Sequence, residues 1–360
     1  MNGTIIMRYI GLRFLRNVIG VYFVCAGLIF VVESIENLRR ASVRDVGADI
    51  VFTLALYRTP VLAEQVLPFS VLIGAILTYL MLSRSSELAV ARAAGMSAWQ
   101  FLLPALVIAA VLGVFSACVY NPVAAVLSRE HETMSFDAFI GSGGRTVSKP
   151  VWLRQQSVDG PAVIHADDSA EGGTRLRNVT AYVYAPDESF VERVEAPSAR
   201  LESGRWVLED ASTFRPNQQM QKSPTYFLST YLTPEQTKTL TTSADSVSFW
   251  DLGETIEINE KSGLSTEKLR YEYQSLLARP ILFTVMVVIA ATVSLGIFRS
   301  GQIGRMIISG IGAGFVFYVT LKIVGDLGSV GVLNPALSAW GPILIALLLG
   351  TRMLLVQEDG

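Results

Sequence analysis

The residue types that carry out catalysis are few in this chain and are not arranged for it. Gly141–Ser142–Gly143–Gly144 is followed by Arg145–Thr146, whereas a phosphate-cradling loop needs Gly-Lys-Ser/Thr at that point. His131 and His165 are single and lack the spacing of metal ligands. No Ser, His and Asp set resembles a nucleophile elbow. We therefore expect a chain that is not an enzyme and that holds no metal or cofactor.

Three closely spaced arginines offer a different chemistry, the recognition of an anion. Arg39, Arg40 and Arg44 follow an apolar stretch. A guanidinium group binds phosphate through two parallel hydrogen bonds and stays charged at neutral pH. The simpler interpretation is a solvated basic turn whose arginines pair with acidic neighbours, namely Glu33, Glu36 and Asp45.

A polar loop between two further apolar stretches carries one acid and two arginines. These are Arg84, Glu87 and Arg92, and they stand among small residues. The loop favours a short helix that Ser86 can cap and Gly95 can end. Small residues would let the surface of another protein approach closely. The alternative is an ordinary loop at the membrane interface.

The composition indicates which elements must position these residues. The chain has 360 residues, of which 51% are hydrophobic and 17% charged, and its mean hydropathy is +0.43. An average soluble protein has about 25% charged residues. A net charge of −2 supplies no basic field for nucleic acid, and two cysteines cannot form a disulfide framework. The composition therefore predicts a membrane protein with a polar part attached.

Six stretches are bare enough of charge to cross a bilayer. A spanning helix needs about 20 apolar residues. Three stretches precede a long polar segment and three follow it: the residues between Arg16 and Glu33, Gln65–Ser83, Phe101–Val119, Pro280–Phe298, Met306–Leu321 and Leu327–Thr351. We predict six transmembrane helices.

Basic residues in the short loops indicate the orientation of these spans. Four loops or ends on one side carry arginine, at Arg8, Arg13 and Arg16, at Arg84 and Arg92, at Arg299 and Arg305, and at Arg352. That side is expected to be cytoplasmic, so both termini lie there and the central polar segment lies outside. The arginines at 39, 40 and 44 break this rule.

The central polar segment predicts an all-β domain. Its apolar residues alternate with polar ones, and Ser203–Gly204 suits a tight hairpin turn. Turn signals recur at the spacing of a β-sandwich or jelly roll. We expect residues 1–125 to hold the first three spans, residues 126–268 to form the β-domain, and residues 269–360 to hold the last three spans.

A few charges lie in or beside the spans, where ionisable groups are functional candidates. Arg58 and Glu64 are six residues apart and lie on different helix faces. Lys322 and Asp326 are four apart, share a face and can pair. We interpret the second pair as structural.

Small residues open one face of the fifth span. Gly310, Gly312 and Gly314 alternate there, and a Gly-xxx-Gly pattern lets helices approach closely. A mobile contact and simple packing within one subunit are both consistent with this pattern.

At several of these places the sequence resembles the LptF/LptG family, the permease subunits of the lipopolysaccharide export ABC transporter. The resemblance rests on Arg8–Tyr9–Ile10, on Ser86–Glu87–Leu88 through Ala94–Gly95, and on three spans at either side of a β-domain. It covers nearly the whole chain. Gly314–Phe315–Val316–Phe317–Tyr318–Val319 and the short carboxy-terminal tail look more like the G-type subunit than the F-type.

The resemblance implies an assembly in the bacterial inner membrane. A G-type subunit would pair with an LptF-type permease subunit and be powered by a dimeric cytoplasmic LptB-type ATPase. Its periplasmic β-domain, jelly-roll-like, would join a bridge of LptC- and LptA-type proteins towards the outer membrane. No Walker A sequence occurs in this chain, in agreement with a separate ATPase.

The resemblance also implies roles for particular residues. Residues 84–97 would form the coupling helix, with Glu87 inserted into a groove of the ATPase and Arg84, Arg92 and Gly95 around it. Lipopolysaccharide would enter between span one of one subunit and span five of the other, where Gly310, Gly314 and Phe317 would belong to the gate helix. Arg39, Arg40 and Arg44 would recognise the phosphates of lipid A.

Two other functions fit the composition and the order of the spans. One is a membrane scaffold whose β-domain recruits periplasmic partners without moving lipid. The other is an ABC permease for a different envelope lipid. The loop around Glu87 favours a transporter over a scaffold.

Overall fold

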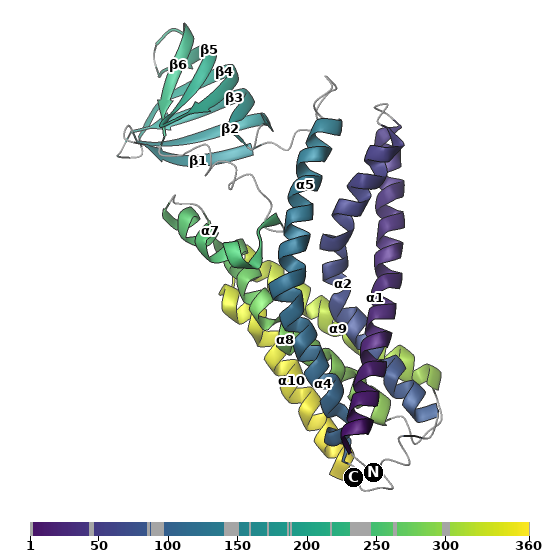
Figure 1. The fold of residues 1–360 in the computed structure, drawn as a ribbon. Coiled ribbons are helices and arrows are strands. Elements are labelled where there is room, and N and C mark those ends of the chain that lie inside the picture. Colours follow the sequence, from purple (N-terminus) through teal and green to yellow (C-terminus); the bar gives the residue numbers. More distant parts are fainter. Residues whose placement is uncertain are drawn as a thin grey trace. The chain divides into compact units, whose positions relative to one another are not determined.

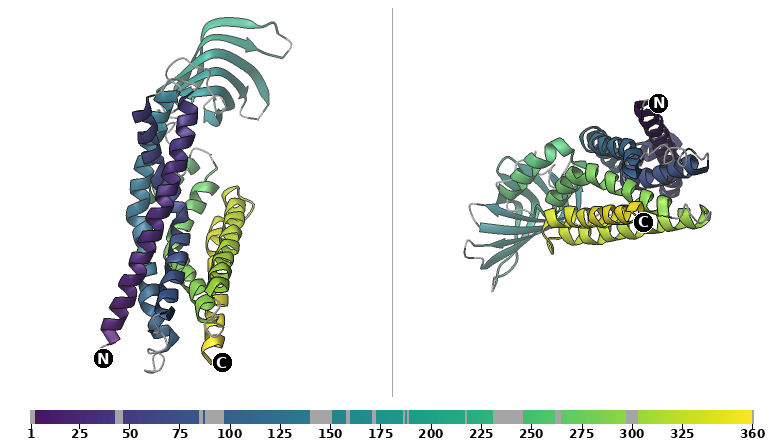
Figure 2. Two further views of the ribbon diagram at one scale, coloured as in Figure 1. Left: turned by 90° about the vertical axis from the view of Figure 1, so that its right-hand side faces the viewer. Right: turned by 90° about the horizontal axis from the view of Figure 1, so that it is seen from below.

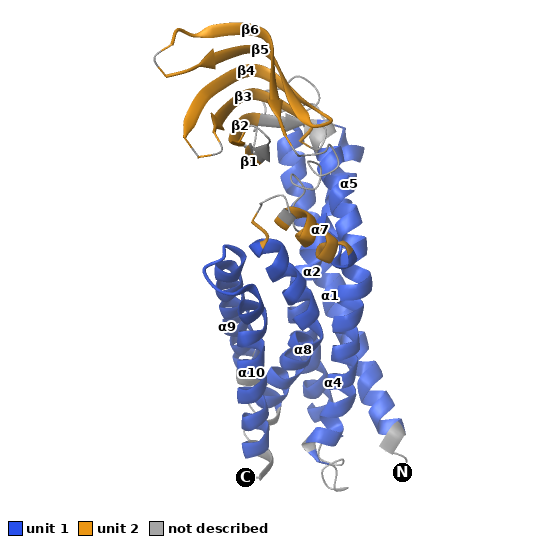
Figure 3. Ribbon diagram, turned by 90° about the vertical axis from the view of Figure 1, so that its left-hand side faces the viewer, with its two compact units in different colours: residues 1–139, 245–250, 267–360 blue, residues 140–244, 251–266 orange. Residues whose placement is uncertain are grey.

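The computed structural model describes residues 3–42, 47–84, 87, 97–139, 151–157, 160–170, 173–185, 187, 189–216, 218–230, 246–261, 265–296 and 303–359. The chain forms two compact units (Figure 3). One comprises residues 1–139, 245–250 and 267–360, and the other comprises residues 140–244 and 251–266. Each unit is described by itself below.

The first unit is a bundle of long helices (Figures 1 and 2). Its elements are α1 (Gly3–Ala41), α2 (Ala48–Arg84), α4 (Ala98–Phe115), the π-helical segment η1 (Ser116–Tyr120), α5 (Asn121–Phe139), α8 (Glu267–Gly296), α9 (Ile303–Ser329) and α10 (Pro335–Asp359). Helices α4 and α5 continue into one another through η1. Among the described residues, six helices are long and apolar enough to cross a membrane, as predicted.

Helices α2 and α8 lie at the centre of this bundle. The most apolar 18-residue stretch of each of these two helices is 56% buried, whereas the corresponding stretch is 11% buried in α1 and 17% buried in α9 and α10. Helix α2 packs against α1, α5, α8 and α9, and α8 packs against α4 and α10 as well. The outer helices therefore keep apolar faces that lipid or other transmembrane helices can cover.

The second unit contains one antiparallel sheet. Its strands are β1 (Val151–Ser157), β2 (Gly160–Ala170), β3 (Arg175–Tyr184), β4 (Phe190–Glu202), β5 (Arg205–Phe214) and β6 (Gln221–Ser229). They follow one another in sequence order across the sheet (Figure 1). The predicted β-domain between the two sets of spans is confirmed, and its described strands form an antiparallel meander.

One side of the sheet carries an apolar core centred on Trp206. The Trp206 side chain is fully buried, and its indole Nε1 donates a hydrogen bond to Gln155 Oε1 at 3.1 Å. Gln155 Nε2 in turn donates to the Ser229 carbonyl at 3.2 Å. A buried indole N–H needs such a partner, so the pair fixes β1 and β6 against β5.

The expected hairpin turn joins β4 to β5. Glu202 pairs with Arg205 across it, and Gly204 has a φ of +80°, a conformation that glycine adopts without strain. The Glu202 carboxylate accepts hydrogen bonds from Arg205 and Arg200, each at 3.1 Å. These guanidinium groups, Arg205 foremost, lower the pKa of Glu202 below its ordinary value.

The segment predicted as all-β also contains a helix, α7 (Phe249–Lys261). Leu252, Thr255 and Asn259 are its buried positions, at helical spacing. Only one of these three side chains is aliphatic. The sequence therefore shows no apolar periodicity that would predict this helix. In addition, α5 continues past residue 125 to Phe139.

Candidate functional site

An apolar groove lies between α1, α2 and α9. It has a volume of about 410 Å³ and is lined by Leu28, Ile29, Val32, Glu33, Leu62, Gln65, Val66, Phe69 and Tyr318. The rings of Phe69 and Tyr318 join α2 to α9 across it, with centroids 4.8 Å apart. Glu33 and Gln65 supply polar atoms in a largely aliphatic wall. The groove can accommodate hydrocarbon chains and offers little to a polar solute.

The end of α1 that follows this groove carries the predicted arginines. Arg39 and Arg40 both donate to Glu36 Oε1, at 3.0 and 3.1 Å. Their side chains nevertheless stay 77% and 60% exposed. The pairing with Glu36 agrees with the simpler interpretation of a solvated basic turn, and most of each arginine side chain remains accessible. Arg44 lies outside the described residues.

His131 on α5 lies in the electrostatic field of two arginines from other helices. The guanidinium groups of Arg58 on α2 and Arg40 on α1 both act electrostatically on the imidazole of His131 on α5. The His131 Nδ1 atom is buried and makes no hydrogen bond within the described structure. The sequence predicts no metal-binding role for His131 and no role for Arg58.

The opposite end of α1 contacts Glu87. Arg13 Nη1 lies 3.4 Å from Glu87 Oε1, and the Tyr9 hydroxyl donates to the same oxygen at 3.5 Å. Arg13 also donates to Tyr9 at 2.7 Å. The carboxylate remains 39% exposed. Of the predicted coupling segment, Arg92 and Gly95 lie outside the described residues, whereas Arg84 ends α2.

The glycine face of α9 packs inside the chain. A Cβ added at Gly310 would meet Ile76 Cδ1 of α2 at 2.7 Å, and one at Gly314 would meet the Leu72 side chain. Gly312 has open space beside it. Phe317 is partly buried against the helical core. This arrangement favours packing within one subunit for Gly310 and Gly314. Ile311, Phe315 and Val316 of the same helix are exposed.

Of the charged residues near the spans, Lys322 and Asp326 form an exposed pair, whereas Glu64 takes part in a buried one. Lys322 and Asp326 pair at 3.5 Å, and both side chains are about two-thirds exposed, at 65% and 64%. The predicted pairing is therefore confirmed. Glu64 does not use Arg58 but contacts Arg279 on α8, far away in the sequence. No sequence spacing signals that contact.

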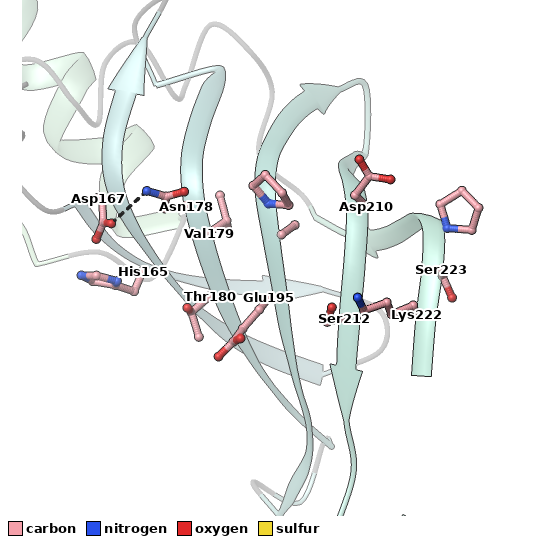
Figure 4. Close-up of a pocket in the computed structure, with 13 residues that line it drawn as sticks. His165, Asp167, Asn178, Val179, Thr180, Glu195, Asp210, Ser212, Lys222 and Ser223 are labelled. Carbon is pink, nitrogen blue, oxygen red and sulfur yellow. Dashed lines mark hydrogen bonds between the residues drawn. The ribbon is translucent and has the colours of Figure 1, made fainter. Parts of the chain in front are cut away.

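The sheet carries a separate polar groove of about 980 Å³ (Figure 4). One row of side chains crosses five neighbouring strands in register: His165, Thr180, Glu195, Ser212 and Lys222. Beside it, Asn178 donates to Asp167 at 3.2 Å. The groove mixes both charges with neutral donors and acceptors. Within the described residues, no group of three or more His, Cys, Asp or Glu residues could hold a metal ion.

Six apolar helices interrupted by an inserted antiparallel sheet define a multi-pass membrane protein with a separate β-domain. The sequence matches the family described as "Lipopolysaccharide export system permease LptF/LptG" over residues 8–356, and the chain belongs to this family. It is similar to the lipopolysaccharide export system permease protein LptG of Escherichia coli K12, with 24% identity over 341 residues and 93% of each chain covered. The protein of the same name from Haemophilus influenzae is 22% identical over 331 residues, with 89% of each covered.

Family membership and the six apolar helices together indicate a multi-pass permease subunit of the inner membrane.

Proposed function

We propose that the chain is the G-type permease subunit of an ATP-driven exporter that extracts lipopolysaccharide from the inner membrane. It would act with an LptF-type permease subunit and a dimeric LptB-type ATPase in the cytoplasm. The lipid would then pass to the periplasmic β-domain and on to a bridge of LptC- and LptA-type proteins. Both termini would be cytoplasmic.

The observation that carries this proposal is the pairing of an apolar groove with basic groups on the same helix. Leu28, Ile29 and Val32 line the groove, and the exposed guanidinium groups of Arg39 and Arg40 follow on α1. Lipid A combines acyl chains with phosphates. The groove would hold the chains, and the arginines would bind the phosphates through charge-assisted hydrogen bonds.

The proposed link to the ATPase is Glu87. Its carboxylate contacts Arg13 and Tyr9 of α1, the helix that also lines the groove. A force applied to Glu87 by an ATPase would therefore reach α1 directly. Because the carboxylate is 39% exposed, it can also accept a hydrogen bond from a docked partner.

The test is co-expression of the chain with LptF-type and LptB-type subunits, followed by purification and measurement of ATP hydrolysis with and without lipopolysaccharide. We expect a stable complex whose hydrolysis responds to lipopolysaccharide. Glu87→Lys should remove the ATPase from the complex or abolish the response. Glu254→Lys is the matched control, because Glu254 is an exposed acid on α7.

The rival functions predict different results. A scaffold would tolerate Glu87→Lys and show no lipid-dependent hydrolysis. A permease for another envelope lipid would respond to vesicles of phospholipid alone as strongly as to vesicles that contain lipopolysaccharide. Either result would refute the proposed function.

A further inference from the structure

A buried ion pair joins α2 to α8 inside the helical unit. Arg279 Nη1 donates to Glu64 Oε1, and the two side chains are only 15% and 8% exposed. Both residues belong to candidate membrane spans. Taking two charges out of water is costly unless the geometry is good and further hydrogen bonds satisfy the remaining polar atoms.

Neighbouring polar groups supply those further bonds. Arg279 Nη1 also donates to Ser116 Oγ at 3.1 Å, where the π-helical segment η1 begins. Asn121 Nδ2 lies 3.5 Å from Glu64 Oε2, directly after η1 ends. Single-turn π segments inside α-helices occur frequently at functional sites. Here η1 presents Ser116 and Asn121 to the two halves of the ion pair.

A chain of hydroxyl groups extends the cluster to α1. The Tyr120 hydroxyl donates to the Pro60 carbonyl at 2.8 Å, one turn before Glu64 on α2. The Tyr22 hydroxyl of α1 lies 2.7 Å from the Tyr120 hydroxyl. Helices α1 and α2, which form two walls of the apolar groove, are thus tied to the same polar cluster.

Arg279 has a second carboxylate within reach. Its Nη2 atom lies 3.9 Å from Glu272 Oε1, and Glu272 stands two turns earlier on the same helix, α8. If α2 moved away from α8, Arg279 would keep an anionic partner on its own helix. Glu64 would keep Asn121, which follows η1. Arg279 would then keep a charged partner, and Glu64 would keep a hydrogen-bond donor.

We propose that the Glu64–Arg279 pair is a latch between α2 and α8 that opens during transport, with Glu272 receiving Arg279 in the open state. Arg279 and Glu64 are then positioning residues that act on the groove through α2. This inference rests on the proposed function, because it assigns the latch to the cycle of the ATP-driven permease.

A latch that opens during transport and an ion pair that stays closed predict different results for two variants. Glu272→Gln leaves the closed pair intact and removes the alternative partner, so only a latch would be affected. Glu64→Gln combined with Arg279→Gln removes both charges of the closed pair at once, a change that an ion pair with a purely structural role tolerates better than the loss of one charge. Lys322→Gln with Asp326→Asn is the control, because that pair lies on one helix and is exposed.

The readouts are assembly with the LptF-type and LptB-type subunits, and ATP hydrolysis with and without lipopolysaccharide. We expect Glu272→Gln to assemble normally and to lower the lipid-stimulated rate roughly tenfold, the effect of losing one hydrogen bond to a charged group. The doubly neutral variant should hydrolyse ATP without lipid and lose most of its response. The control variant should match the wild type.

Glu272→Gln decides the question even if the doubly neutral variant fails to assemble. A wild-type response in Glu272→Gln would overturn the latch, and so would failure of that variant to assemble, because Glu272 would then support the closed state. If the wild-type complex itself does not respond to lipopolysaccharide, the proposed function fails before the latch is reached. The two failures are therefore distinguishable.

Discussion

At Gly113, α4 lies against the backbone of α8 beside Arg279, one member of the buried ion pair. A Cβ added there would lie 2.7 Å from the Pro280 nitrogen and 2.9 Å from the Arg279 carbonyl carbon. Ordinary carbon contacts begin near about 3.5 Å, so Gly113→Ala would push α4 and α8 apart by about 1 Å. Backbone atoms cannot rotate away as a side chain can.

The expected cost of this substitution combines two opposing effects. Overpacking a close contact costs about 1–3 kcal/mol, and alanine recovers at most about 1 kcal/mol over glycine within a helix. Gly20→Ala in α1 is the matched control, since no atom lies within 4 Å of its added Cβ. We therefore expect Gly113→Ala to be less stable than Gly20→Ala by about 1–3 kcal/mol.

Thermal unfolding of the purified complex in detergent measures this difference. The midpoint should fall by several degrees for Gly113→Ala, at about 2–4 °C for each kcal/mol in domains of moderate size. The midpoint of Gly20→Ala should stay at or above that of the wild type. Equal midpoints for the two variants would refute the backbone contact between α4 and α8.

Three further predictions test other parts of the molecule. Arg39→Glu with Arg40→Glu should weaken lipopolysaccharide-stimulated ATP hydrolysis; unchanged stimulation and binding would exclude a role in lipid recognition. Trp206→Ala should destabilise the β-domain by about 3–5 kcal/mol and remove the indole hydrogen bond to Gln155. Limited proteolysis of the full chain should then cleave that domain faster. Because the pKa of Glu202 is lowered, its support of the β4–β5 hairpin is present above the ordinary carboxyl pKa and is lost as pH falls through the lowered one. The protection of the hairpin amides from hydrogen exchange, relative to the intrinsic exchange rate at each pH, should therefore fall only in acid, and a loss of protection near neutral pH would contradict this.

The sequence predicts those features that depend on local composition. The six spans are recognisable in the sequence because each is a long stretch with few or no charged residues. The hairpin at Gly204 follows from two residues whose backbone preferences suit a tight turn. The pairing of Lys322 with Asp326 follows from one helical turn. All of these depend on residues close together in the chain.

The remaining features depend on which helices meet, and the sequence does not encode that locally. Glu64 and Arg279 are 215 residues apart, so no spacing rule joins them. The same holds for Gly113 against Pro280. Gly310 and Gly314 left two interpretations open, which only the position of α2 can separate.

The most direct test of the account is whether lipopolysaccharide occupies the groove between α1, α2 and α9. A photoreactive amino acid at Ile29 lines that groove, whereas one at Leu348 lies on an exposed face of α10. In the assembled complex we expect lipopolysaccharide to crosslink to position 29 more strongly than to position 348, and to leave position 29 when ATP is added. Equal crosslinking at both positions, with no response to ATP, would contradict the proposed path.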